Sequence, residues 1–195
     1  MNIRDAKFAS VDLETTGLDP MSDEIIAIGI VPMEGFSILS SQSFYSLVKP
    51  KKWKVNSSKI HGISYSELEK APTLDEISQK VLELLEGKII VGFCIQIDYE
   101  FLRRALKKLN SRTLDVLKID KVLSRFLGEK YTSSPTLEDL AKKYGVFPSY
   151  THNALADAFI AAQIFQIQLI RLLKAGANTL EKLLSFLNEP ELPII

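Results

Sequence analysis

The sequence predicts an α/β domain in which helices flank a mixed central sheet of about five strands. Three strand-like segments follow one another near the N-terminus, and short strands then alternate with helices up to the C-terminal region. Successive strands joined by turns pair antiparallel, whereas strands joined through a helix pair parallel. A length of 195 residues with 46% hydrophobic and 25% charged residues is ordinary for one globular domain.

The first three strands are predicted from short apolar runs rich in β-branched residues. Residues 7–13 and 24–33 are such runs, and the segment between them is rich in Gly, Asp and Pro. This pattern is typical of two adjacent antiparallel strands. Residues 37–48 continue as a third strand, which Pro50 closes.

The chain then alternates between helices and strands. The apolar residues of TLDEISQKVLELLEG recur at helical spacing, with Thr73 as the N-cap and Gly87 as the stop. Residues 88–91 are predicted as a short buried strand, 98–109 as a helix and 114–117 as another strand. This alternation predicts the parallel part of the sheet.

Two further helices are expected at residues 136–144 and 153–173, and the second is apolar nearly all round, which predicts burial. A small helix at 180–187 precedes the final ELPII. We therefore expect a domain over residues 1–175 and a tail over residues 176–195 that is a candidate docking element.

The balance of charges argues against a tight, non-specific binder of polyanions and leaves one local basic segment. Lys plus Arg and Asp plus Glu each total 24, so global charge does not favour tight, non-specific binding to a polyanion. A local basic segment, KPKKWK at residues 49–54, can contact phosphates and stack Trp53 on a base, or can protect an edge strand from aggregation.

The expected location is the cytoplasm. The single cysteine, Cys94, fits a reducing compartment, and the N-terminal MNIRDAKF lacks the apolar core of a signal peptide. The longest apolar stretch, residues 25–33, is far shorter than the ~20 residues that span a bilayer.

Four carboxylates occupy places where apolar residues would be expected. Asp12 and Glu14, in SVDLETTGL, lie two positions apart on a predicted strand and so leave the sheet on the same face. Asp98 follows a buried strand and opens a helix, and Asp157 lies in the first turns of the buried helix. An uncompensated carboxylate in such a setting is costly, so each needs a partner.

Hard divalent cations are the partners that best suit this set of acids. Neither Lys nor Arg lies close in sequence to Asp12, Glu14 or Asp157, and carboxylate oxygens are the ligands that Mg²⁺ and Mn²⁺ prefer. Two such ions about 4 Å apart stabilise the attacking and leaving oxygens of a phosphoryl displacement. His152, just before the helix that carries Asp157, can reach the attacking water as a general base.

Each feature also has a plainer interpretation. An Asp-x-Glu pair on a strand is usually a solvated face, a helical Asp among alanines is usually a satisfied polar contact, and a lone histidine is usually a capping or surface residue. Their joint occurrence on three separate core elements favours the catalytic interpretation.

Three segments resemble the motifs of the DEDDh 3′–5′ exonucleases, which include the proofreading epsilon subunit of bacterial DNA polymerase III and RNase T. These are VDLETTGL, IDYEFL and HNALADA. IHGIS at 60–64 is similar to the HGI element of that family, and TLEDLAKKYGV at 136–146 to the helix before its third motif. The resemblance covers about residues 6–172 and implies a ribonuclease H-like fold.

The resemblance also implies a reaction and a set of roles. The reaction is removal of nucleoside 5′-monophosphates from the 3′ end of single-stranded or frayed DNA or RNA, with two Mg²⁺ or Mn²⁺ ions. The implied metal ligands are Asp12, Glu14, Asp98 and Asp157.

The other implied roles concern the base and the substrate. His152 becomes the general base, and Thr15 and Leu18 contact the 3′-terminal nucleotide, with Leu18 packing on its base. His61 lies along the strand being degraded. The second motif differs from the family pattern, because Phe93 and Cys94 of GFCIQID stand where His-Asn is usual and Ile97 where Phe is usual. Phe93 can stack on a base or fill the core.

Two functions from different classes remain open at this point. The first is the metal-dependent 3′–5′ exonuclease. The second is a non-catalytic or weakly active nucleic-acid-binding or polymerase-associated module on the same fold, with the tail after residue 176 contacting a protein partner. The complete ligand set favours the enzyme. DNA or RNA substrate, a proofreading or trimming role and the oligomeric state are not specified by the sequence.

Overall fold

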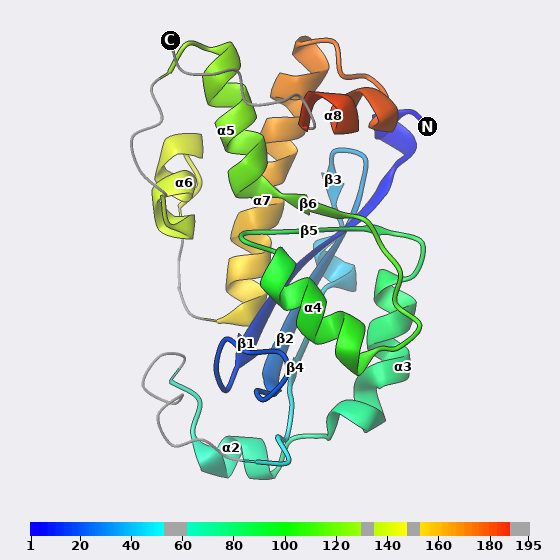
Figure 1. The fold of residues 1–195 in the computed structure, drawn as a ribbon, viewed down its shortest axis with the longest axis vertical. Coiled ribbons are helices and arrows are strands. Elements are labelled where there is room, and N and C mark those ends of the chain that lie inside the picture. The colour runs from blue at the N-terminus through cyan, green and yellow to red at the C-terminus, as the bar shows by residue number, and fades with distance from the viewer. Residues whose placement is uncertain (53–61, 130–134, 148–152, 188–195) are drawn as a thin grey trace.

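The computed structural model describes residues 1–52, 62–129, 135–147 and 153–187 of the chain (Figure 1). A twisted sheet with six described strands forms the centre of the domain. The long helix α7 (Ala154–Lys174) crosses one face of the sheet, where it is surrounded by α5 (Val116–Phe126), α6 (Leu137–Tyr144) and α8 (Leu180–Leu187). The other face is covered by α3 (Leu74–Leu85) and α4 (Gln96–Ala105).

The sheet is mixed, and the predicted fold class is confirmed. Its order is β3-β2-β1-β5-β6, with β4 also paired to β2. Strands β1, β2, β3 and β4 pair antiparallel, whereas β5 is parallel to β1 and β6 is parallel to β5. The strands are β1 Lys7–Thr15, β2 Ile25–Glu34, β3 Ser37–Ile38, β4 Phe44–Leu47, β5 Ile89–Gly92 and β6 Thr113–Asp115.

The prediction of one strand over residues 37–48 is wrong, because a 3-10 turn at Ser40–Gln42 divides it into β3 and β4. The hydroxyl of Ser43 donates to the carbonyl oxygen of Ser40 at 2.8 Å. Serine side chains that bond locally to the backbone compete with strand pairing in this way. Both short strands nevertheless pair with β2.

The five predicted helices are present, and two helices that were not predicted, α2 and α5, are added to them. Thr73 and Thr136 form capping boxes at the starts of α3 and α6, as their positions before Glu76 and Asp139 favour. The helices are α2 Tyr65–Glu69, α3 Leu74–Leu85, α4 Gln96–Ala105, α5 Val116–Phe126, α6 Leu137–Tyr144, α7 Ala154–Lys174 and α8 Leu180–Leu187.

The strand predicted over residues 114–117 ends early, because helix α5 begins at Val116. The Asp115 carboxylate accepts the amide N–H of Leu117 at 2.9 Å and thereby caps the new helix. The buried side chains of Val116, Ile119 and Leu123 recur at helical spacing. The helix predicted over 98–109 likewise shifts to Gln96–Ala105.

Helix α7 is the central helix of the core. It is the one helix, among the residues described, that is long and apolar enough to cross a membrane. Its contacts with β1, β2, β5, α5 and α6 explain this apolarity as burial within the fold. Phe165 of α7 packs edge-on against Phe8 of β1, with ring centroids 5.0 Å apart.

Helix α8 packs beside the N-terminus. The amide of Ile3 donates to the carbonyl oxygen of Asn178 at 3.2 Å, and the amide of Leu180 donates to that of Met1 at 2.9 Å. The side chain of Leu183 is buried in the core. A boundary at residue 175 and a docking role for the tail stay predictions, and residues 188–195 lie outside the described part of the chain.

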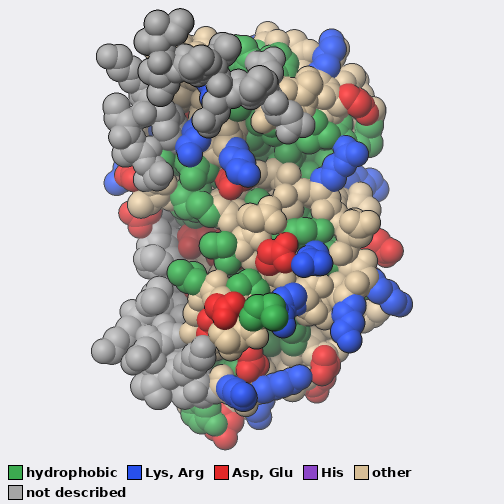
Figure 2. Space-filling model, viewed as in Figure 1, with side chains coloured by type: hydrophobic (Ala, Val, Ile, Leu, Met, Phe, Trp, Pro, Cys, Tyr) green, Lys and Arg blue, Asp and Glu red, His purple; other side chains and the backbone are tan. Residues whose placement is uncertain are grey.

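The surface mixes charges of both signs. Figure 2 shows Lys and Arg side chains interspersed with Asp and Glu on one face of the domain, in keeping with the net charge of zero. This face therefore shows no single-sign field that would favour non-specific binding to a polyanion.

Candidate metal centre and active site

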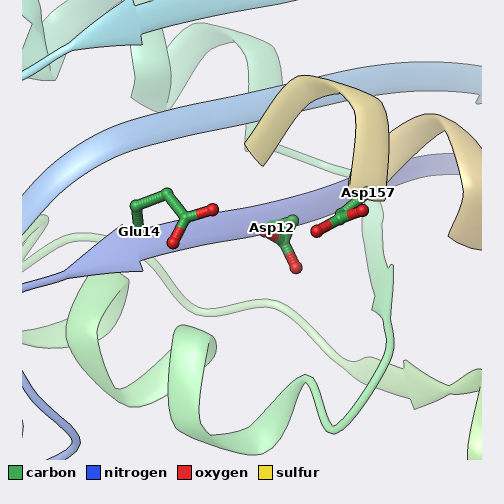
Figure 3. A group of neighbouring side chains, drawn as sticks. All are labelled: Asp12, Glu14 and Asp157. Carbon is green, nitrogen blue, oxygen red and sulfur yellow. The ribbon is translucent and has the colours of Figure 1, made fainter. Parts of the chain in front are cut away.

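Three of the four predicted metal ligands come together at one end of the sheet. Asp12 and Glu14 extend from the same face of β1, and Asp157 approaches them from the first turn of α7 (Figure 3). One carboxylate oxygen from each lies within 4.8 Å of the others. All three side chains are half-buried, so the cluster is partly removed from water.

The start of α7 is held by its cap. The side-chain oxygen of Asn153 accepts the amide N–H groups of Leu155 and Ala156 at 3.1 and 3.2 Å. Ala154 and Ala158 are fully buried, and such small residues let the first turns approach the sheet closely. Asp157 therefore lies near the positive end of the helix dipole, which favours a carboxylate there.

The fourth predicted ligand, Asp98, is next to this group but not part of it. It lies in the first turn of α4, directly after β5. The Asp98 charge contributes to the raised pKa of Asp12, and the Glu14 charge contributes to the raised pKa of Asp98. These couplings place Asp98 within electrostatic reach of both β1 acids.

Burial and mutual repulsion disfavour the charged forms of Asp12 and Asp98. Burial raises the pKa of Asp12 well above its ordinary range, and the charges of Asp98, Asp157 and Glu14 raise it further. Burial, followed by the charges of Glu14 and Asp115, likewise raises the pKa of Asp98. A divalent cation removes this repulsion, and a set made only of carboxylate oxygens fits Mg²⁺ or Mn²⁺. The residues present therefore fit the predicted metal.

The predicted substrate contacts Thr15 and Leu18 lie in and beside the turn that follows β1. The hydroxyl of Thr15 donates to the carbonyl oxygen of Gly17 at 2.7 Å, and the hydroxyl of Thr16 donates to Asp23 at 3.0 Å. These bonds order the turn, at whose surface the side chain of Leu18 is 79% exposed. Leu18 is thus free to pack against a base, and its role stays a prediction.

Both predicted histidines, His61 and His152, lie outside the described residues, as does Trp53. Lys51 and Lys52 of the basic segment are described and exposed. Their backbone amides donate to the Glu24 carboxylate at 2.7 and 3.0 Å, beside a cavity of about 720 Å³. Phosphate contact by this segment stays a prediction.

Two residues near the acids were not found from the sequence. The Asp115 carboxylate accepts the amide N–H of Cys94 at 3.2 Å and contributes to the raised pKa of Asp98. Tyr45, on β4, has a pKa raised by burial and by the Glu14 charge, and its hydroxyl bonds with Asn153. Nothing in the segment FYSL marks Tyr45, because its proximity depends on strand register.

The departure from the second motif has a structural consequence at Cys94. Among the described residues, Cys94 is the one non-glycine residue with a positive φ, at 50°. This conformation costs an ordinary L-residue roughly 1–2 kcal/mol and is tolerated by Asn. Phe93, in contrast, is half-buried and packs against the apolar cluster around α7, which favours the core-filling interpretation.

Cys94→Asn is therefore expected to raise the free energy of unfolding by about 0.5–1 kcal/mol, because Asn adopts this backbone conformation at lower cost. Denaturant titration of the metal-free protein measures the change. Cys94→Ala is the matched control: it removes the thiol without relieving the backbone, so its stability should not rise. Equal stabilisation by both variants would contradict the backbone explanation.

The sequence comparison decides the family. The sequence profile of the family RNase_T, described as Exonuclease, matches residues 10–165. The chain belongs to this exonuclease family, which is the DEDDh family predicted from its motifs and is also called DnaQ-like. The predicted family membership is thereby confirmed, and the matched segment includes all four acids and His152.

Several curated relatives are DNA polymerase III proteins. The chain is 35% identical over 185 residues to DNA polymerase III PolC-type of Thermotoga maritima, which covers 92% of this chain and 13% of that protein. It is 31% identical over 170 residues to DNA polymerase III subunit epsilon of Aquifex aeolicus, covering 84% of this chain and 81% of the relative. The chain thus spans a small part of the PolC-type relatives and most of this epsilon subunit.

Solved structures share the fold. E. coli exonuclease I in complex with a dA16 oligonucleotide superposes with a TM-score of 0.73 at 18% identity, covering 92% of this chain and 45% of that one. Cell-death related nuclease 4 superposes with a TM-score of 0.71 at 19% identity, covering 89% and 65% of the two chains.

Proposed function

We propose that this DnaQ-like domain is a 3′–5′ exonuclease that hydrolyses phosphodiester bonds at the 3′ end of single-stranded or frayed DNA or RNA, using two Mg²⁺ or Mn²⁺ ions. The observation that carries the proposal is the meeting of Asp12, Glu14 and Asp157 within 4.8 Å, with Asp98 beside them. Membership of an exonuclease family supports the same reaction class.

The chemistry assigns distinct roles to the residues. Asp12, Glu14, Asp98 and Asp157 hold the cations, which when bound neutralise charge on the phosphate and make water more acidic. Leu18 packs on the terminal base and Thr15 orders the turn beside it. An imidazole nitrogen of His152 takes a proton from the attacking water as its oxygen bonds to phosphorus. The bond from phosphorus to the 3′ oxygen of the preceding nucleotide breaks, that oxygen takes up a proton from water to leave a 3′-hydroxyl end, and a nucleoside 5′-monophosphate is released.

The second candidate is a non-catalytic or weakly active module on the same fold, which binds nucleic acid or associates with a polymerase in the cytoplasm. The observation that favours it is that relatives are a PolC-type polymerase and an epsilon subunit of DNA polymerase III. The two candidates are separated by the rate of metal-dependent mononucleotide release from the isolated chain, which is high for the enzyme and weak or absent for the module.

Metal removal is expected to abolish activity. The chain should release no mononucleotides from a 5′-labelled oligonucleotide in EDTA and should recover when Mg²⁺ or Mn²⁺ is added in excess. The cation should also raise the melting temperature, because it binds the folded site and relieves repulsion among the acids. Full activity in EDTA would contradict the metal-dependent reaction.

The polarity of digestion is tested with the same oligonucleotide carrying a 3′-phosphate, which should block hydrolysis. DNA and RNA versions compared side by side identify the preferred substrate. Efficient cleavage of a circular single strand would exclude an exonuclease acting from a free 3′ end.

A further inference from the structure

Three residues in a row cross the sheet beneath the start of α7. Asp12 of β1 is the cross-strand partner of Gly29 of β2, and Gly29 is the partner of Tyr45 of β4. Cross-strand partners extend from the same face of a sheet. The candidate metal ligand Asp12 and the tyrosine Tyr45 therefore flank a position that has no side chain.

The first turn of α7 fills the space above Gly29. A Cβ atom at Gly29 would lie 2.5 Å from the amide nitrogen of Leu155, and the carbonyl carbon and oxygen of Ala154 would be closer still. These atoms are backbone, so no change of rotamer can make room. Gly29 is not among the glycines with a positive φ, so the position requires glycine for space rather than for backbone conformation.

Tyr45 holds the same helix end from the other side of Gly29. Its hydroxyl bonds with the side chain of Asn153, the N-cap of α7, and its ring lies close enough to Glu14 for that charge to act on it. The side chain is 39% exposed, so packing in the core does not account for it. Tyr45 thus connects the acidic strand to the residue that follows His152 in sequence.

We propose that Gly29 and Tyr45 are positioning residues that seat the N-terminus of α7 on the sheet and so set the position of Asp157 opposite Asp12. Gly29 acts by the absence of a side chain, and Tyr45 acts through its bond with Asn153. Neither residue is a candidate metal ligand. The effect on catalysis rests on the proposed nuclease function, whereas the packing of the first turn of α7 over Gly29 does not.

The seat is tested first in metal-free protein by hydrogen exchange of peptides covering residues 154–158. Gly29→Ala should raise exchange of the first-turn amides by roughly tenfold or more and leave the C-terminal half of α7 unchanged. The matched control is Val81→Ala, which removes methyl groups from the apolar cluster on the other face of the sheet. If the first-turn amides of α7 exchange no faster in Gly29→Ala than in Val81→Ala, Gly29 does not position this helix end and the proposal is overturned.

Metal affinity then tests the link to the acids. Titration with Mn²⁺ alone should give a Kd about tenfold or more higher in Gly29→Ala than in wild type, because residues that orient metal ligands usually have effects of this size. An unchanged Kd overturns the positioning role. If wild-type protein binds Mn²⁺ but hydrolyses no oligonucleotide, the proposed nuclease function is contradicted. Hydrogen exchange and the Mn²⁺ Kd of Gly29→Ala still test the positioning role in that case.

Tyr45→Phe provides a variant that keeps the ring and loses only the hydroxyl, in case Gly29→Ala does not fold. It should raise first-turn exchange and lower kcat about tenfold with KM unchanged, since Asp157 is displaced while the predicted base contact at Leu18 is kept. Ser46→Ala is its control, because the Ser46 hydroxyl bonds to the adjacent carbonyl oxygen of Leu47. Wild-type exchange and kcat in Tyr45→Phe overturn the role of Tyr45.

Discussion

Asp12→Asn is expected to remove nearly all turnover and, at neutral pH, to stabilise the metal-free protein. Burial raises the pKa of Asp12, and the charges of Asp98, Asp157 and Glu14 all raise it further. Loss of Asp12 removes one of the proposed metal ligands, and metal assistance contributes several kcal/mol, so we expect a fall of about 10³-fold or more in kcat. Mononucleotide release under saturating Mg²⁺ measures this effect.

The stability gain has a defined pH dependence. Because the pKa of Asp12 is raised in the folded protein, the folded state holds its proton more tightly than the unfolded chain does. Wild-type protein therefore loses stability as pH rises from about 4, the ordinary value for Asp, through the raised pKa. Asn carries no charge, so the variant should have the higher melting temperature in EDTA at pH 7 and lose that advantage near pH 4.

Asp139→Asn is the matched control, because the pKa of Asp139 is shifted in the opposite direction. The amide and hydroxyl of Thr136 donate to this exposed carboxylate and lower its pKa. Its substitution should destabilise the protein at pH 7, with the loss disappearing as pH falls below about 4. If Asp12→Asn instead lowered the melting temperature at pH 7 in EDTA, the repulsion assigned to the four acids would be contradicted.

The proximity of the acids was predictable in part. Alternation along a strand places Asp12 and Glu14 on one face, and an acid in the first turn of a buried helix suggests Asp157 as a third member. These inferences use only spacing within one element. The approach of α7 depends on Gly29, and sequence spacing contains no information on which residue lies beneath which helix turn.

The same limit explains the other differences. The positions of Tyr45 and Asp115 near the acids follow from register and from the start of α5, which are set by pairing between distant segments. Helix α5 was not predicted, because Asp115 is both the last residue of strand β6 and the N-cap of α5. The helix therefore begins with no turn segment between it and the strand. Local pattern identified the elements well, whereas tertiary pairing determines their boundaries and their relative placement.

His152→Ala is expected to lower kcat by about 100-fold or more while leaving the Kd for Mn²⁺ nearly unchanged, because a general base typically contributes ~10²–10⁴-fold and is not a metal ligand here. His152 lies outside the described residues, but it directly precedes Asn153, which caps α7 four residues before Asp157. The predicted base is therefore next in sequence to the N-cap of the helix that carries the proposed metal ligand Asp157, and measurements of kcat and of Mn²⁺ affinity on the same variant separate the two roles.

The pH profile distinguishes a base from a structural histidine. Wild-type kcat should fall at acidic pH, because an imidazole that has gained a proton can no longer accept one from the attacking water. The variant should lose that limb, and added imidazole should restore part of its rate. His61→Ala is the matched control, because His61 is the second of the two histidines of the chain. His61 is expected to contact the substrate strand, so its loss should raise KM and leave the acidic limb of the kcat profile in place. A His152→Ala enzyme that keeps the wild-type acidic limb would show that the proton is taken by another group.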